Sequence, residues 1–224
     1  MPLLLTDEAY KDLFDHLFDP EQNGDEYTRL NALEGDNIGY SVGFEAPANF
    51  ELKLLNQPQE GIELEVVLLD HYRKRVVYFN RVEVIEDIPV DHEKPVAQVM
   101  IWRDRSNHGK VASGLVEKVF FGLLVDQYDV VVSDSEQTRE GRGMWIRLLG
   151  HAVDHPDLLA GTLDKEQGEF TRLASEKDLY NAQNWLWGNK DIHRNRLGLI
   201  QKINSVFMLL LMLPAMFSFG GMPV

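Results

Sequence analysis

The residues best suited to chemistry lie in a polar turn that follows an apolar run of strand length. Residues 95–102 are apolar apart from Gln98, and the chain then becomes polar from Arg103 to Lys110. A glycine-containing turn between a strand and a helix can present several backbone N–H groups to an anion. The candidate anion-binding residues are Asn107, His108, Gly109, Lys110, Val111, Ala112 and Ser113.

A repeating order of strand and helix surrounds this turn. Apolar residues at i, i+4 spacing predict a helix over 111–127, and a β-branched run predicts a strand near 129–133. A second helix is expected over about 140–153. Because a crossover helix joins them, the strands near 96–102 and 129–133 are expected to run parallel. The i, i+4 stripe of the first helix is Val111, Leu115, Val119 and Leu123.

The turn resembles the acetyl-CoA pyrophosphate loop of the GNAT acyltransferase superfamily. In that family an Arg or Gln, two free positions, a Gly, one free position and a Gly or Ala open a helix whose amides hold the pyrophosphate. Here Asn107 stands at the Arg or Gln position, Lys110 replaces the first Gly, and Ala112 fits the last position. The resemblance therefore implies a degenerate loop. We expect no cofactor to be bound, with acetyl-CoA as the alternative.

A second turn extends the resemblance. Residues 133–138, 143–145 and 148–149 are similar to a pattern of phage-encoded GNAT-like proteins, and the resemblance covers roughly residues 60–153. Active members of the family usually carry a Tyr in the corresponding helix that protonates the leaving thiolate. No Tyr lies between Asp129 and Tyr180, so that role has no obvious holder, and no catalytic residue is assigned.

Composition excludes several classes of function. The net charge of −14 and the pI near 4.9 argue against binding to nucleic acid, since phosphate binding needs a basic surface. The absence of cysteine excludes disulfides, thiolate metal sites and a Cys nucleophile. Met1–Leu5 is too short and lacks the basic start of a signal peptide, so none is expected.

Two further groups of residues have weaker claims to chemistry. Glu83, Glu86 and Asp87 could supply a general base, but charged residues alternating along a strand favour a solvated face. His151 and His155 have the i, i+4 spacing of a metal pair. Pro156 ends the helix there, however, which favours contacts with the terminal carbonyls, and no metal site is predicted.

The remaining segments complete an α+β prediction. We expect a helix over 6–18, a loop or irregular helix over 21–37, strands over 38–45, 50–55, from 62 and over 76–85, a polar linker over 157–168, a strand over 169–174, a helix over 177–187 and an edge strand over 194–202. The predicted fold is GNAT-like, a mixed, mostly antiparallel sheet with flanking helices and an apolar C-terminal extension. The predicted divisions are a GNAT-like domain over 1–165, its sheet and helix extension over 166–202, and a tail over 203–224.

The tail carries no charged residue after Lys202. Its apolar run is broken by Pro214 and is shorter than the roughly twenty residues of a membrane-spanning helix. An exposed apolar tail would aggregate, so residues 203–224 are expected to be buried against a protein partner or in a homo-oligomer. Insertion into a membrane is the less favoured alternative.

Three functions remain open from the sequence. The preferred one is a phage-type GNAT-fold protein that acts as a structural (virion or assembly) or host-targeting interaction protein, placed in the host cytoplasm or the virion. The second is an active acyl-CoA N-acyltransferase, with the amides of Gly109 to Ser113 on the pyrophosphate. The third is a membrane-associated protein anchored by its tail.

Overall fold

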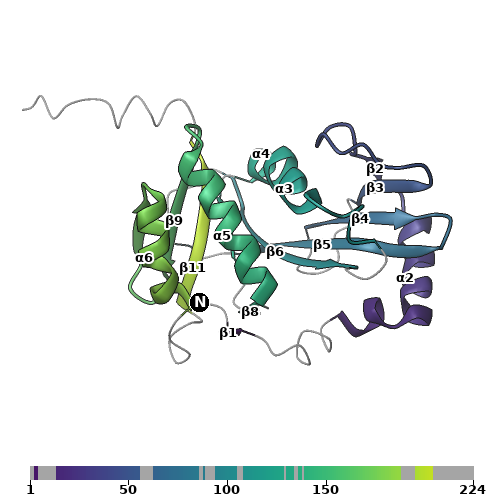
Figure 1. Cartoon of the computed structure of the whole chain (residues 1–224), viewed down its shortest axis with the longest axis horizontal. Helices are drawn as coiled ribbons and strands as arrows, with labels where there is room; N and C mark the ends of the chain where they lie inside the picture. The colour runs from purple at the N-terminus through teal and green to yellow at the C-terminus, as the bar shows by residue number, and fades with distance from the viewer. Residues whose placement is uncertain are drawn as a thin grey trace, which may run out of the picture.

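The computed structural model describes residues 3–4, 14–55, 63–85, 88, 94–104, 108–128, 130–133, 136–137, 139–187 and 195–203. Within them the chain forms an α+β structure on a mostly antiparallel sheet of nine strands, in the order β10-β9-β11-β7-β6-β5-β4-β3-β2 (Figure 1). The strands are β2 Asp36–Asn37, β3 Phe50–Leu55, β4 Leu64–Asp70, β5 Arg75–Ile85, β6 Val96–Arg103, β7 Val130–Val132, β9 Leu158–Asp164, β10 Glu169–Leu173 and β11 Arg196–Lys202. A separate parallel pair joins β1 (Leu3–Leu4) to β8 (Glu136–Gln137).

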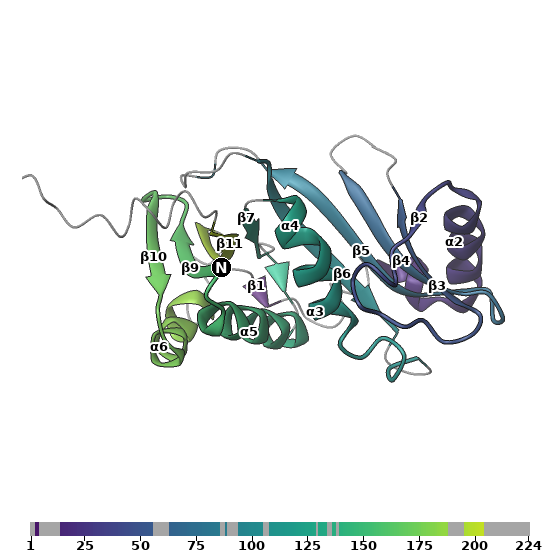
Figure 2. The same ribbon diagram turned by 90° about the horizontal axis from the view of Figure 1, so that it is seen from above.

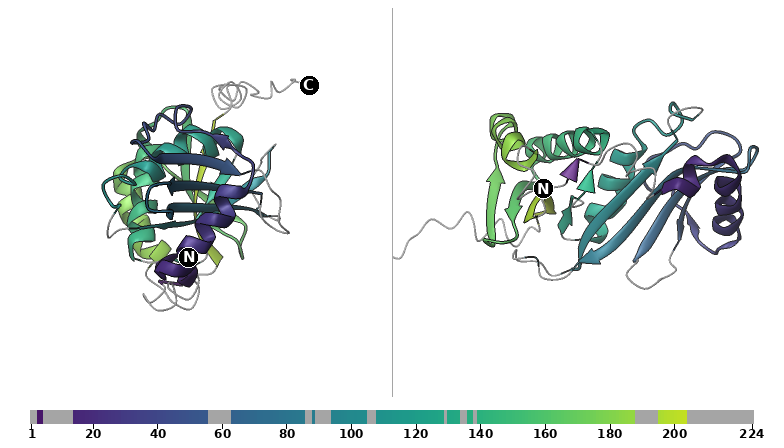
Figure 3. Two further views of the ribbon diagram at one scale, coloured as in Figure 1. Left: turned by 90° about the vertical axis from the view of Figure 1, so that its right-hand side faces the viewer. Right: turned by 90° about the horizontal axis from the view of Figure 1, so that it is seen from below.

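Helices cover the two faces of the sheet unequally. One face carries α2 (Pro20–Ala32), which crosses the N-terminal strands (Figure 3, left). The other face carries a continuous helical crossover and then α5 and α6, which lie next to each other (Figure 2). The crossover consists of α3 (Leu115–Val119), the π-helical turn η1 (Phe120–Leu124) and α4 (Val125–Gln127), and the two later helices are α5 (Arg139–Asp154) and α6 (Glu176–Trp187).

The apolar core lies on both faces of the sheet, because successive side chains of the central strands point to opposite faces. On β4, Val66 and Leu68 belong to the apolar cluster beneath the crossover and α5, whereas Val67 and Leu69 pack with Leu30 of α2. All seven residues of β4 are buried. The strand predicted to begin at residue 62 with one buried face is therefore covered on both faces, which explains its nearly unbroken apolar run.

The predicted parallel pair is confirmed. β6 and β7 pair in parallel from Val96 opposite Val130 to Gln98 opposite Val132, while every other pairing of the nine-stranded sheet is antiparallel. The crossover and α5 follow β6 and β7 as expected. The predicted helix over about 140–153 is also confirmed by α5.

The helix predicted over 111–127 begins later than predicted, and its line of buried residues shifts by one position part-way along. Residues 108–114 form a turn and the helix begins only at Leu115, because Gly114 has a φ of 71°, which an α-helix does not allow. Further on, η1 inserts a π-helical turn. The buried stripe passes from Leu115 and Val119 to Leu124, and Leu123 is only partly buried.

Several other sequence predictions need correction. Residues 38–45 are not a strand but mostly a turn, in which Gly43 has a φ of 66°. The predicted polar linker over 157–168 contains β9, in which every residue from Ala160 to Leu163 is buried. The strand predicted at 194–202 is present as β11, but it lies between β9 and β7, and β10 forms the edge.

The first predicted helix ends at residue 18, as expected, and a second helix begins at Pro20. Residues 14–18 are helical, and the segment expected over 21–37 as a loop or irregular helix forms the regular helix α2 up to Ala32 and then the short strand β2. Asp19 caps α2, because its carboxylate accepts hydrogen bonds from the amides of Glu21 and Gln22 at 2.9 Å each. The strands over 50–55, 76–85 and 169–174 and the helix over 177–187 are confirmed within one residue at each end.

Some predictions fall outside the described residues. These are the start of the first helix, Glu86, Asp87, Asn107 and the tail from 204 onward. Among the helices that the structure does describe, none is long and apolar enough to cross a membrane.

A buried asparagine ties α2 to the sheet, and its replacement is the first test of this fold. Asn23 donates to the carbonyls of Leu17 and Val76 and accepts from the amide of Val76, at 2.9, 3.2 and 2.9 Å. Asn23→Ala should lower the free energy of unfolding by about 2–4 kcal/mol, because it leaves buried backbone groups without partners. Urea unfolding measures this change. Gln22→Ala, an exposed neighbour on α2, should change it by less than about 0.5 kcal/mol.

Candidate functional site

The candidate anion-binding turn lies between the end of β6 and the start of α3. His108 and Ala112 are buried, Gly109 and Val111 are half-buried, and Lys110 and Ser113 are exposed. The turn therefore presents Lys110 and Ser113 to solvent, while the side chains of His108 and Ala112 hold it to the core.

The backbone amides of the turn are only partly available to a ligand. The amide of Ala112 donates to the carbonyl of His108 at 3.0 Å, and the amide of Ser113 donates to Lys110 at 3.3 Å. The amides of Gly109, Lys110 and Val111 have no acceptor within the described part of the chain. Lys110 avoids the positive φ that its side chain would resist, since the left-handed residue of this turn is Gly114.

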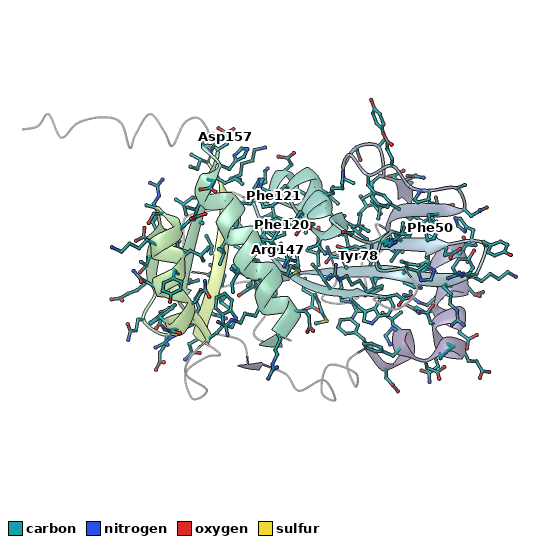
Figure 4. The ribbon with its side chains drawn as sticks, in the orientation of Figure 1. Phe50, Tyr78, Phe120, Phe121, Arg147 and Asp157 are labelled. Carbon is teal, nitrogen blue, oxygen red and sulfur yellow. The ribbon has the colours of Figure 1, made fainter. Side chains whose placement is uncertain are left out.

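His108 is the anchor of the turn. Its Nδ1 lies 2.6 Å from Oδ2 of Asp104, and its Nε2 lies 3.1 Å from Oδ2 of Asp70, at the end of β4. The ring also packs edge-on against Phe50, which is labelled in Figure 4, with 6.0 Å between ring centroids. The imidazole thus links three parts of the chain that are distant in sequence.

Asp70 connects this anchor to the β4–β5 hairpin. Its Oδ1 accepts hydrogen bonds from the amides of Tyr72 and Arg73, both at 3.0 Å, and so closes the hairpin turn. The guanidinium of Arg73 lies 3.4 Å from Nε2 of His108. Asp70 therefore joins the hairpin turn to the imidazole that anchors the candidate turn.

A second hydrogen-bonded chain lies beside the first. Nδ1 of His71 lies 2.9 Å from the hydroxyl of Tyr27, and its Nε2 lies 3.1 Å from Oε2 of Glu51. Burial raises the pKa of Tyr27, and the negative charges of Asp70 and Glu51 raise it further. A phenol held neutral in this way is a hydrogen-bond donor rather than a nucleophile, so this chain ties α2 to β3 and the hairpin.

Sequence reasoning missed the residues that hold the turn. Asp70 was assigned no role, and Asp104 was placed only in the polar stretch from Arg103 to Lys110. The available signal was the i, i+4 spacing of Asp104 and His108, which places a carboxylate one turn from an imidazole. No local pattern could show that Asp70, 38 residues earlier, faces the other ring nitrogen.

The remaining candidates do not assemble into a catalytic or metal site. Glu83 is half-buried on β5. The centroids of the His151 and His155 rings lie 5.8 Å apart, and the His151 ring lies 4.2 Å from the ring of Phe121, which is labelled in Figure 4. In the described ranges, no three His, Cys, Asp or Glu side chains are grouped so that they could hold a metal ion.

Comparisons with known proteins give no further assignment. No protein-family model, no curated protein and no solved structure matches this chain. The described residues define an α+β protein whose nine-stranded sheet has one parallel crossover, and this crossover begins with a charged turn anchored by His108.

Replacement of His108 tests whether it anchors the turn. His108→Leu should lower the free energy of unfolding by about 2–4 kcal/mol, because the buried carboxylate of Asp70 and that of Asp104 lose their shared partner. Thermal or urea unfolding gives the value. Lys110→Ala, an exposed change two residues away, should stay within about 0.5 kcal/mol of the parent. Equal effects of the two changes would show that the imidazole does not hold the turn.

Proposed function

We propose that this chain is a GNAT-fold protein of the phage-encoded kind with a degenerate acetyl-CoA loop, and that it acts as a structural (virion or assembly) or host-targeting interaction protein. The order of elements supports the fold. Helices over 14–32 precede the antiparallel strands β3 to β6, and a strand, helix, strand, helix unit follows with one parallel pair. That order is the one implied by the family resemblance.

The loss of cofactor binding rests on the charges around the turn. Asp70 and Asp104 lie at hydrogen-bonding distance from His108, the buried side chain that anchors the turn. The carboxylates therefore oppose a polyanion, while the side chain of Lys110 adds bulk where the family has glycine.

One observation favours the second function, an active acyl-CoA N-acyltransferase. The unbonded amides of Gly109, Lys110 and Val111 are consecutive, and such a group of donors can hold an anion. An acidic surface would then attract an amine substrate. The two functions differ in one measurable quantity, the affinity for acetyl-CoA.

Calorimetric titration with acetyl-CoA separates the two functions. We expect the full-length protein to bind no tighter than millimolar, because of the carboxylates and the replacements at positions 107 and 110. The double change Asn107→Arg with Lys110→Gly should raise the affinity if the rest of the loop is intact. Micromolar binding by the unchanged protein would make the acyltransferase the better function.

The proposed partner surface is the tail over 203–224. Within it the structure describes only Ile203, whose amide donates to the carbonyl of Asp157 at 2.8 Å. The tail is uncharged and rich in Leu, Met and Phe. A large apolar side chain contributes about 1.5–3 kcal/mol when it is fully buried, so a protein interface or a homo-oligomer would gain much from covering it.

Deletion of Ser205–Val224 tests this surface. We expect the shortened protein to keep its melting temperature, because residues buried in an assembly interface do not stabilise the fold of the separate domain, and to form smaller and more soluble assemblies. Light scattering and thermal melts on both forms measure the two effects. A large drop in melting temperature would place the tail in the protein's own core, and flotation of the full chain with liposomes would favour the membrane alternative.

A further inference from the structure

The longest free edge of the nine-stranded sheet is β10. The opposite edge, β2, has only two residues, whereas β10 has five and pairs with β9 in a regular register from Glu169 opposite Asp164 to Leu173 opposite Ala160. Figure 2 shows β10 as the outermost strand at its end of the molecule. None of its residues has a partner on the outer side among the described residues.

This edge has no proline, lysine or bulge to protect it against pairing with another strand. Proteins commonly block an edge strand with proline, lysine, a bulge or a covering segment. β10 has the sequence Glu-Phe-Thr-Arg-Leu and no register shift, and Glu169, Thr171 and Arg172 are exposed. Its two charges cancel, although the chain as a whole carries −14. The edge is therefore electrostatically neutral on a strongly acidic protein.

The symmetry of a paired edge restricts the register. Two copies of a strand in one antiparallel sheet are related by a two-fold axis normal to the sheet, so a residue lies opposite itself at the centre. A centre at Arg172 would place like charges face to face, which is unfavourable. A centre at Phe170 would leave Leu173 unpaired and set Arg172 opposite Gly168, whose φ of 67° belongs to a turn.

A centre at Thr171 uses the whole strand. All five residues then pair, Thr171 lies opposite Thr171 of the second copy, and Arg172 lies opposite Phe170 on each side of the axis. Arginine beside an aromatic ring is a favourable pair. The helix α6, which packs next to β10, also carries Tyr180, whose side chain is 74% exposed and available at the same end of the molecule.

We propose that β10 pairs antiparallel with β10 of a second copy of this chain, centred on Thr171, so that two nine-stranded sheets become one. This self-association surface is independent of the tail over 203–224. It does not depend on the fold family or on the cofactor loop. The chain would then have one interface that joins two copies and another, the tail, that reaches a further partner.

A single introduced cysteine tests the pairing in the full-length chain, which contains no cysteine of its own. Directly opposite residues in an antiparallel pair have Cα atoms about 4.5–5.5 Å apart, within the range of a disulfide. With diamide as the oxidant, Thr171→Cys should form a disulfide-linked dimer at least tenfold faster than Thr28→Cys. Thr28 is an exposed threonine on α2 and serves as the matched control.

A second control tests the register. Glu169 lies on the same strand and the same face as Thr171, but its copy would be about 13 Å away along the paired strand. Glu169→Cys should therefore cross-link as slowly as Thr28→Cys. If Thr171→Cys reacts no faster than either control on a non-reducing gel, the proposal is wrong. Because the readout is the disulfide rather than assembly size, a failure here is distinct from a failure of the tail deletion.

Discussion

The parallel pairing of β6 with β7 is the constraint on which the rest of the structure depends. A parallel neighbour cannot be reached by a tight turn, so the chain must cross over the sheet between the two strands. The crossover places α3, η1 and α4 on one face of the sheet. The later helices α5 and α6 lie on the same face. The strands on either side of the pair are antiparallel and are reached by hairpins or by insertion of β11 between β7 and β9.

The start of that crossover is held to the sheet by one buried side chain. The chain leaves β6 at Arg103 and becomes α-helical only at Leu115, and the intervening turn gains its main side-chain anchor from His108. Asp70 serves two purposes, since one carboxylate oxygen closes the β4–β5 hairpin and the other meets the imidazole. The hairpin and the crossover are thus fixed by the same side chain.

Elements with a long, regular apolar pattern were predicted correctly from the sequence. Predictions were wrong where contacts between distant segments determine the local structure. The order of strand, helix, strand and helix from β6 to α5 was predicted correctly, because each apolar pattern there is long. Residues 38–45 were mistaken for a strand, since Ile38, Val42 and Phe44 are apolar, but the chain turns after Ile38 and these side chains pack in the same apolar cluster as the crossover. β9 was missed because Gly161 and Thr162 make it look like a linker. At the candidate site, local spacing suggested the turn, but the facing carboxylate of Asp70 could not be inferred from any local pattern.

The π-helical turn in the crossover changes the angular phase of the residues that follow it. One extra residue rotates the later part of a helix by about 100° relative to the earlier part. The apolar stripe that begins with Leu115 and Val119 therefore continues at Leu124 rather than at Leu123. Loss of one residue here would convert the π turn to an α turn, whereas the loss of one residue in β4 or β5 would exchange the two faces of the strand. A change of one residue in chain length therefore disturbs this segment less than it would disturb β4 or β5.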